Sequence, residues 1–114
     1  MKFSDSLEGD IVIFKLSGKV ITYDDSMTRF HGRIHEYVNL NKNSIIIDLG
    51  KIELMSSVGL GMLISSLTTV KNAGGRMVLA NITRIQNLIA ITRLNTVFES
   101  YDSVEQAVES FNKG

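Results

Sequence analysis

The sequence predicts an α/β fold with a mixed, mostly parallel sheet of about five strands, an antiparallel hairpin at its N-terminal edge, and four helices. Two observations lead to this prediction. Strand-like and helix-like segments alternate after an opening hairpin, as they do in folds with a parallel sheet. The run from Ile45 to Ile47 has no polar alternation, which is typical of a strand covered on both faces. Helices are therefore expected against the sheet.

The N-terminal half supplies the hairpin and the first helix. Apolar residues alternate over residues 3–7, residues 8–10 are a turn signal, and residues 11–16 are predicted to form the second strand. Asp24 or Asp25 can begin a helix, because acids favour the positive end of the helix dipole. Residues 41–43 end this helix, and its apolar positions on one face are Met27, Phe30, Ile34 and Val38.

The C-terminal half predicts three more helices and two more strands after the strand at 45–47. A loop leads from that strand to a helix that begins at Ser56 or Ser57 and ends at Gly74 and Gly75, a C-cap signal. Residues 76–81 and 97–101 are predicted strands, and Ser103 opens the last helix with a capping box. The apolar stripes of the three helices are Leu60, Leu63, Ile64, Leu67 and Val70, then Ile85, Leu88 and Ile89 with Thr92 as a further candidate, and finally Val104, Ala107, Val108 and Phe111.

Composition points to one domain, residues 1–114, and excludes several function classes. Twelve basic and twelve acidic residues give a formal net charge of zero, whereas non-specific nucleic-acid binding needs a basic surplus. The chain has no cysteine, which rules out disulfides, cysteine zinc sites and thiol catalysis. The apolar runs are too short to span a membrane, and the N-terminus lacks the apolar region of a secretory signal. We therefore expect a cytoplasmic protein without direct nucleic-acid binding or membrane insertion.

The segment most informative about function is the start of the second helix, where Ser56 and Ser57 precede Gly59 and Gly61. Glycine costs about 1 kcal/mol relative to alanine inside a helix. Two glycines in one turn therefore indicate that something approaches the backbone closely: another protein, a phosphate or the neighbouring strand. The segment is not a dinucleotide-binding fingerprint, because Ile64 stands where the third glycine would be.

No set of residues for catalysis or metal binding accompanies these serines. A nucleophilic serine needs a nearby base, and the two histidines, His31 and His35, lie on the first predicted helix. Their i, i+4 spacing could place both on one helix face as metal ligands, but no local Asp or Cys completes a site. We interpret them as partly exposed residues beside the apolar stripe, and we expect neither an enzyme nor a cofactor or metal.

Nearly the whole chain resembles a STAS domain of the anti-sigma factor antagonist type. The most specific part is the segment 45–61, IIIDLGKIELMSSVGLG, which is similar to the family's strand, loop and helix start with its D-S-S/T-G-L-G pattern. Further similarity comes from residues 74–79, 92–94 and 103–107 and from Phe98. The resemblance implies a STAS-like fold and a small protein that binds an anti-sigma factor, itself a serine kinase, and so releases a sigma factor.

The resemblance also implies a phosphorylation switch. The family's kinase modifies a serine at the start of the second helix, and a metal-dependent phosphatase removes the phosphate. Alignment on the G-L-G pattern places that serine at Ser57, with Ser56 as the second candidate. Ser56 stands where the family has an acid, and Ile21 stands where it often has another, with Asp24 the nearest acid downstream.

We expect the partner to bind around this turn. The three apolar residues there, at positions 55, 58 and 62, need not all fit inside the fold, and methionine suits adaptable surfaces; the alternative is that all three belong to the core. A second hypothesis is a STAS scaffold or regulatory partner in another assembly, a stress-signalling complex or a membrane transporter, without a phosphorylation switch. The predicted contact residues are Met55, Ser56, Ser57, Val58, Gly59, Gly61, Met62 and Asp24.

Overall fold

The strands of the computed structural model, which describes residues 1–113, form one sheet in the order β1-β2-β3-β4-β5. β1 (Lys2–Glu8) pairs antiparallel with β2 (Ile11–Val20). From β2 onward, the pairings with β3 (Ser44–Met55), β4 (Arg76–Ala80) and β5 (Ser100–Tyr101) are all parallel. The predicted mixed sheet with an antiparallel hairpin at its edge is confirmed.

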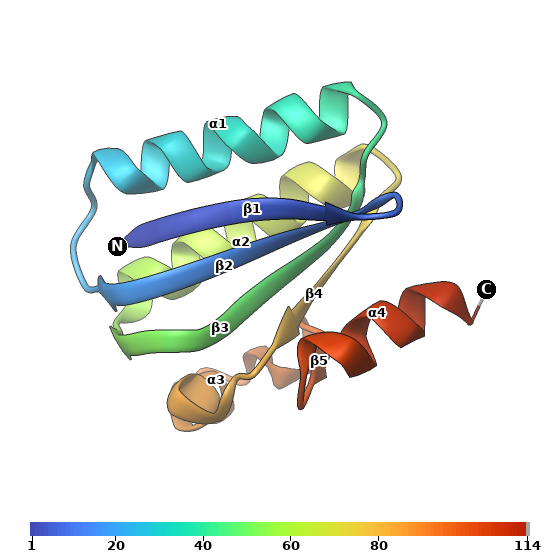
Figure 1. The fold of residues 1–114 in the computed structure, drawn as a ribbon. Coiled ribbons are helices and arrows are strands. Elements are labelled where there is room, and N and C mark those ends of the chain that lie inside the picture. Colours follow the sequence, from blue (N-terminus) through green and yellow to red (C-terminus); the bar gives the residue numbers. More distant parts are fainter. Residues whose placement is uncertain (114) are drawn as a thin grey trace.

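The described part of the chain holds the four predicted helices. α1 (Asp25–Asn39) and α2 (Ser57–Asn72) cover one face of the sheet, and α4 (Val104–Asn112) lies on the other (Figure 1). α3 (Gln86–Ile91) is short and follows a 3₁₀ turn at Thr83–Ile85. None of the helices described is long and apolar enough to cross a membrane.

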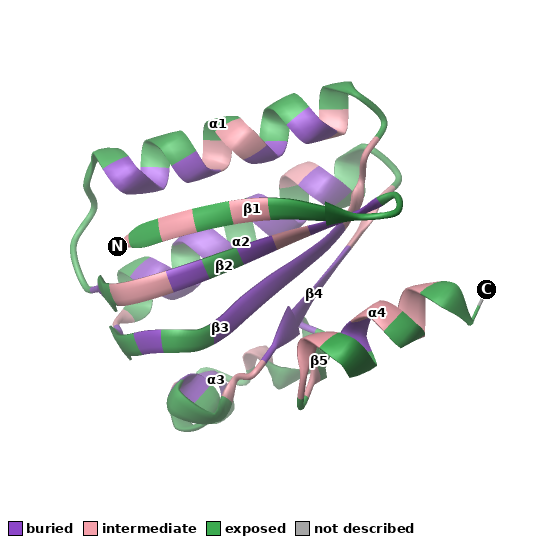
Figure 2. Ribbon diagram, in the orientation of Figure 1, coloured by how far each residue is buried: buried purple, intermediate pink, exposed green. Residues whose placement is uncertain are grey.

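Side-chain alternation along the strands builds a core on each face of the sheet. Ile45 and Ile47 belong to the larger core beneath α1 and α2, where Phe14 and Phe30 pack edge to face with ring centroids 5.1 Å apart. Ile46 points the other way, into the smaller core beneath α4. All three isoleucines are fully buried (Figure 2). The missing polar alternation therefore follows from helices covering both faces.

Two strands are longer than expected. β2 continues to Val20, and β3 continues to Met55. The prediction of a loop between the central strand and the second helix is therefore wrong. The two extensions pair with each other up to Val20 and Met55, across two register shifts at which β3 has one residue more than β2, so the bulges lie in β3. Pairing with a neighbouring strand stabilises this segment, in which the exposed Lys51 and Glu53 alternate with the apolar Ile52 and Leu54.

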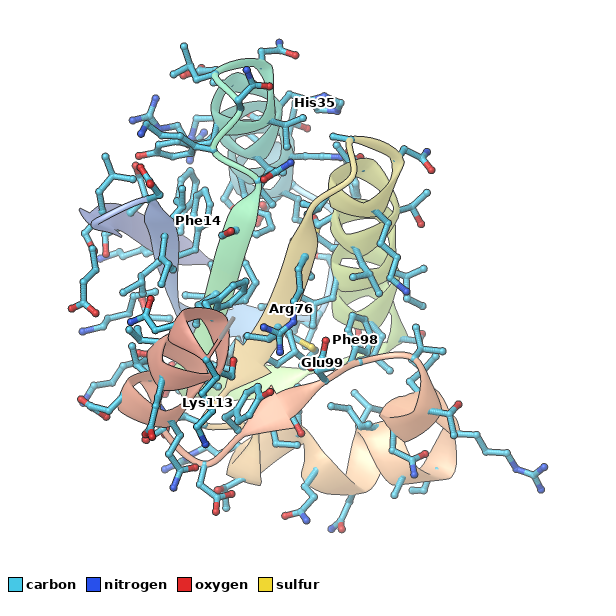
Figure 3. All side chains as sticks on the ribbon, turned by 90° about the vertical axis from the view of Figure 1, so that its right-hand side faces the viewer. Phe14, His35, Arg76, Phe98, Glu99 and Lys113 are labelled. Atoms are coloured by element: carbon cyan, nitrogen blue, oxygen red, sulfur yellow. The ribbon has the colours of Figure 1, made fainter. Side chains whose placement is uncertain are left out.

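The fifth strand is shorter than expected, with only residues 100 and 101 instead of 97–101. A 3₁₀ turn at Leu94–Thr96 ends just before it, and Phe98 is buried in the larger core. Arg76 and Glu99 lie beside each other on neighbouring segments, with a 2.6 Å ion pair (Figure 3). This contact holds the pKa of Glu99 below its ordinary value.

The predicted helix ends are largely confirmed. α2 closes at its C-terminus with the N–H of Gly74 donating to Lys71 and that of Gly75 to Val70, each at 2.9 Å. Ser103 caps α4 by accepting the N–H of Gln106 at 3.1 Å. The reciprocal capping-box bond differs, because the Gln106 side chain accepts the N–H of residue 102.

The apolar stripe of α2 differs from the prediction at one position. Ile64 is 36% exposed, whereas Met62 is buried at 8%. Successive helical residues are about 100° apart, and the buried face is centred between Leu63 and Val70. Ile64 lies one step beyond Leu63 and so falls off the edge of this face.

Candidate functional site

The start of α2 lies at the end of the sheet where β2 and β3 finish. Met55 pairs with Val20, and the N–H of Ser56 donates to the carbonyl of Val20 at 3.0 Å. The helix therefore begins while the chain is still bonded to β2. The connection from β2 to α1 leaves the sheet at the same end (Figure 1).

Ser56 and Ser57 have different roles in this turn. Ser56 is the N-cap of α2, and its Oγ accepts the N–H of Val58 at 3.2 Å. The same hydroxyl lies 3.2 Å from the carbonyl oxygen of Ile21, to which it donates. Ser57 is exposed, and its hydroxyl makes no hydrogen bond to any residue between 1 and 113. Ser57 is thus the accessible serine, and Ser56 is held by the fold.

The two glycines also differ. A Cβ on Gly59 would come within 2.5 Å of the Met55 Cγ and 3.1 Å of a Val20 methyl, so the neighbouring strands account for this glycine. Apart from its own helix backbone and chain neighbours, a Cβ on Gly61 would meet no described atom within 4 Å. Intramolecular packing therefore explains Gly59 and leaves Gly61 unexplained.

The three apolar residues expected at the turn, Met55, Val58 and Met62, also differ in how far the fold buries them. Met55 and Met62 are 7% and 8% exposed and belong to the larger core. Val58 is 37% exposed. The fold therefore uses nearly all of both methionine side chains, and Val58 provides most of the apolar surface that these three residues leave exposed.

Sequence reasoning missed other apolar residues beside this turn. Ile21 and Tyr23, in the connection from β2 to α1, are 43% and 73% exposed. Leu54, next to the end of β3, is 54% exposed. The available signal was that Ile21 and Tyr23 stand close together outside every predicted strand and helix.

A groove of about 270 Å³ lies between α1 and α2 beside this turn. It brings together three of the predicted contact residues, Val58, Gly61 and Met62, with residues of the first helix and its preceding connection. The residues that line it are Tyr23, Met27, His31, Val58, Gly61, Met62 and Ser65.

Asp24, the remaining predicted contact residue, has a role in the fold. It is the N-cap of α1, which confirms one of the two predicted helix starts, and it accepts the N–H of Ser26 at 3.0 Å. Its carboxylate lies 3.8 Å from the N-terminal ammonium group. The hydrogen bond from the Ser26 hydroxyl holds the pKa of Asp24 below its ordinary value. Its neighbour Asp25 is exposed.

Of the two histidines on α1, His31 contacts α2 and His35 stacks on His31. Their rings stack with centroids 4.8 Å apart, and Nε2 of His31 lies 3.0 Å from Oγ1 of Thr69 on α2. His35 is exposed at the outer side of α1 (Figure 3). Burial, followed by the proximity of His35, lowers the pKa of His31. Within residues 1–113 there is no cluster of three or more potential metal ligands.

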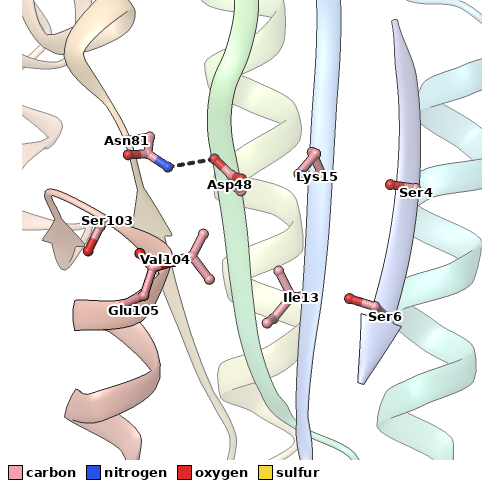
Figure 4. Close-up of a pocket in the computed structure, with 9 residues that line it drawn as sticks. All are labelled: Ser4, Ser6, Ile13, Lys15, Asp48, Asn81, Ser103, Val104 and Glu105. Carbon is pink, nitrogen blue, oxygen red and sulfur yellow. Dashed lines mark hydrogen bonds between the residues drawn. The ribbon is translucent and has the colours of Figure 1, made fainter. Parts of the chain in front are cut away.

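A second hollow, of about 420 Å³, lies on the opposite face of the sheet near the start of α4 (Figure 4). Its floor includes Asp48, which is 7% exposed and accepts hydrogen bonds from the N–H of Gly50 and the amide of Asn81. Asn81 has a positive φ of 58° at the end of β4. The bond from Asn81 ties the end of β4 to the middle of β3, and the bond from Gly50 lies within β3.

Comparison with known proteins gives the family of this fold. Residues 5–107 match the model of the STAS domain. A segment of 75 residues is 29% identical to a Thermotoga neapolitana protein, a homologue of TM1081 provisionally named an anti-sigma factor antagonist; it covers 65% of this chain and 66% of that relative.

Two solved structures share the architecture. TM1081 of Thermotoga maritima has a TM-score of 0.82 at 21% identity, over 95% of this chain and 92% of that one. The unphosphorylated form of the anti-sigma factor antagonist SpoIIAA has a TM-score of 0.76 at 16% identity, over 99% of both chains. With the family model matching nearly the whole sequence, the chain belongs to the STAS domain family.

Proposed function

We propose that this protein is an anti-sigma factor antagonist that binds an anti-sigma factor with serine kinase activity through the start of α2, and that phosphorylation of Ser57 ends this binding. One observation carries the proposal: Ser57 is an exposed serine at a helix start, with a hydroxyl that bonds to no other described residue. The class of partner is supported by relatives that are named anti-sigma factor antagonists.

The acceptor is Ser57 in preference to Ser56. A kinase needs the hydroxyl oxygen free to take the phosphoryl group. Phosphorylation of Ser56 would remove the proton that its hydroxyl donates to the carbonyl of Ile21, a hydrogen bond that contributes about 0.5–1.5 kcal/mol, and would set the phosphate against that carbonyl oxygen. Ser57 has no such bond to lose. Ser56, which stands where the family has an acid, caps α2, and serine is a good N-cap.

A phosphate on Ser57 would leave the fold intact and oppose binding. It adds about −1.5 to −2 charges, and the positive end of the α2 dipole stabilises negative charge by about 0.3–1 kcal/mol at an exposed site. A partner packed on this turn would have to remove water from that charge, which is strongly unfavourable without new cationic contacts. A metal-dependent serine phosphatase would restore the binding state.

The test is affinity capture from cells with the wild type, Ser57→Asp and a matched control, Thr68→Asp, which puts the same charge on an exposed α2 position. The wild type and the control should retain an anti-sigma factor with kinase activity, and Ser57→Asp should not. The purified partner with ATP should then add one phosphate, mapped by mass spectrometry to Ser57.

Three results would contradict the proposal or part of it. One is phosphate on neither Ser56 nor Ser57 after incubation with the captured kinase and ATP. Another is capture of a membrane transporter or a stress-signalling complex in place of an anti-sigma factor, since this would support the scaffold hypothesis. If the wild type and Ser57→Asp capture the anti-sigma factor equally, the proposed binding stands. The proposed control of that binding by phosphorylation of Ser57 is then refuted.

A further inference from the structure

We infer that Gly61 is a contact residue: its missing side chain keeps open the groove between α1 and α2, which takes one apolar side chain of the partner, accompanied by a basic residue. The inference rests on the proposed function and specifies how the anti-sigma factor is bound. Gly61 lines that groove together with Val58 and Met62.

The fold itself gives no reason for a glycine at position 61. Glycine is a much poorer helix former than alanine, and this position lies inside α2. The glycines that need a positive φ are Gly9, Gly18 and Gly74, so Gly61 is not among them. A Cβ there would meet no neighbouring element within 4 Å, in contrast to Gly59, where it would collide with Met55. The remaining explanation for the glycine is that a partner molecule approaches the α2 backbone closely at position 61.

The groove has the chemistry of a pocket for an apolar side chain. Met27, Val58 and Met62 supply apolar walls, and the Tyr23 ring, 73% exposed, stands among the lining residues. The flexible thioethers of the two methionines can adjust to the shape of an inserted group. Because Gly61 has no Cβ, the partner backbone that carries this group can come close to α2.

Charge near the groove selects the partner further. The lining residues include neither Lys nor Arg. Asp25, two residues after Tyr23, is exposed, whereas the Asp24 carboxylate between them already lies 3.8 Å from the N-terminal ammonium group. A partner segment with a Lys or Arg beside its apolar side chain is therefore complementary to this surface, and such rim charges act mainly on the association rate and its salt dependence.

The experiment compares Gly61→Ala and Gly61→Leu with Gly32→Ala as a matched control. Gly32 is also an exposed helical glycine where an added Cβ would meet no described atom within 4 Å, but it does not line the groove. Both alanine variants should raise the Tm by about 4 °C, because alanine is the better helix former. The probe for binding is the purified anti-sigma factor retained by the wild type, measured by calorimetry.

Gly61→Ala should weaken that binding at least tenfold, which corresponds to about 1.4 kcal/mol, and Gly61→Leu should abolish it. Gly32→Ala should bind as the wild type does. Asp25→Asn should weaken binding at low salt and flatten its salt dependence.

Three results would overturn the inference. If Gly61→Ala binds as tightly as the wild type, the groove is not the contact, while the proposed function stands. If Gly61→Ala lowers the Tm, the fold requires the glycine. If the wild type self-associates and Gly61→Leu does not, the occupant is a second copy of the chain. A wild type that binds no anti-sigma factor would refute the proposed function and this inference together.

Discussion

Replacement of Ser56 by alanine should destabilise the fold, whereas the same change at Ser57 should not. The Ser56 Oγ accepts the N–H of Val58, and loss of such a cap costs about 1 kcal/mol. The same hydroxyl donates to the carbonyl of Ile21, and a hydrogen bond of this kind contributes about 0.5–1.5 kcal/mol. Together these bonds predict a loss of about 2 kcal/mol in the free energy of unfolding.

Thermal unfolding followed by circular dichroism can resolve this difference. A chain of this length has an unfolding entropy of about 0.24 kcal/mol per kelvin near its midpoint, so a loss of about 2 kcal/mol lowers the Tm by about 8 °C. Ser57→Ala should stay within about 2 °C of the wild type, as expected for an exposed residue without partners. Equal midpoints for the two variants would refute the different roles assigned to these serines.

Three more changes test other parts of the structure. Gly59→Ala should lower the urea midpoint, because overpacking against Met55 costs about 1–3 kcal/mol and the helix gain recovers only about 1 kcal/mol. The lowered pKa of His31 means that the unfolded chain binds more protons below pH 6.5, so the free energy of unfolding should fall as the pH drops through this range, and less so in His31→Gln. Asp48→Ala should cost about 1–3 kcal/mol in urea unfolding, since two partly buried donors lose their acceptor and each such hydrogen bond contributes about 0.5–1.5 kcal/mol.

The fold could be predicted because its main signals are local. The unbroken isoleucine run at 45–47 needs cover on both faces, and α4 together with α1 and α2 provides it. The full length of β3 was missed, because Gly50 and the charged Lys51 and Glu53 favour a loop, although residues 51–54 alternate polar and apolar as a half-exposed strand does. Residues 48–55 are a strand because β2 pairs with them, and β2 lies more than thirty positions earlier in the sequence.

The position of the candidate site could also be predicted, but not the separate roles of its residues. Two serines and two glycines at a helix start identify the turn from sequence alone. Which glycine is required by packing depends on Met55 and Val20, and the latter comes from a distant strand. The burial of the apolar residues likewise depends on how α2 is oriented on the sheet. A short motif does not determine this orientation.

The outward face of α2 connects the proposed switch with the proposed groove. Ser57 and Gly61 are four residues apart, and Val58 and Gly61 are three apart, so all three share one stripe of the helix. Side chains at such spacings are neighbours, about 5–6 Å apart at Cβ. A partner backbone that lies over Gly61 therefore lies beside Ser57 as well, and it cannot avoid a phosphate there by a small shift. Charge at Ser57 and bulk at Gly61 should consequently block the same binding event, and combining Ser57→Asp with Gly61→Leu should add nothing to the loss caused by either change alone.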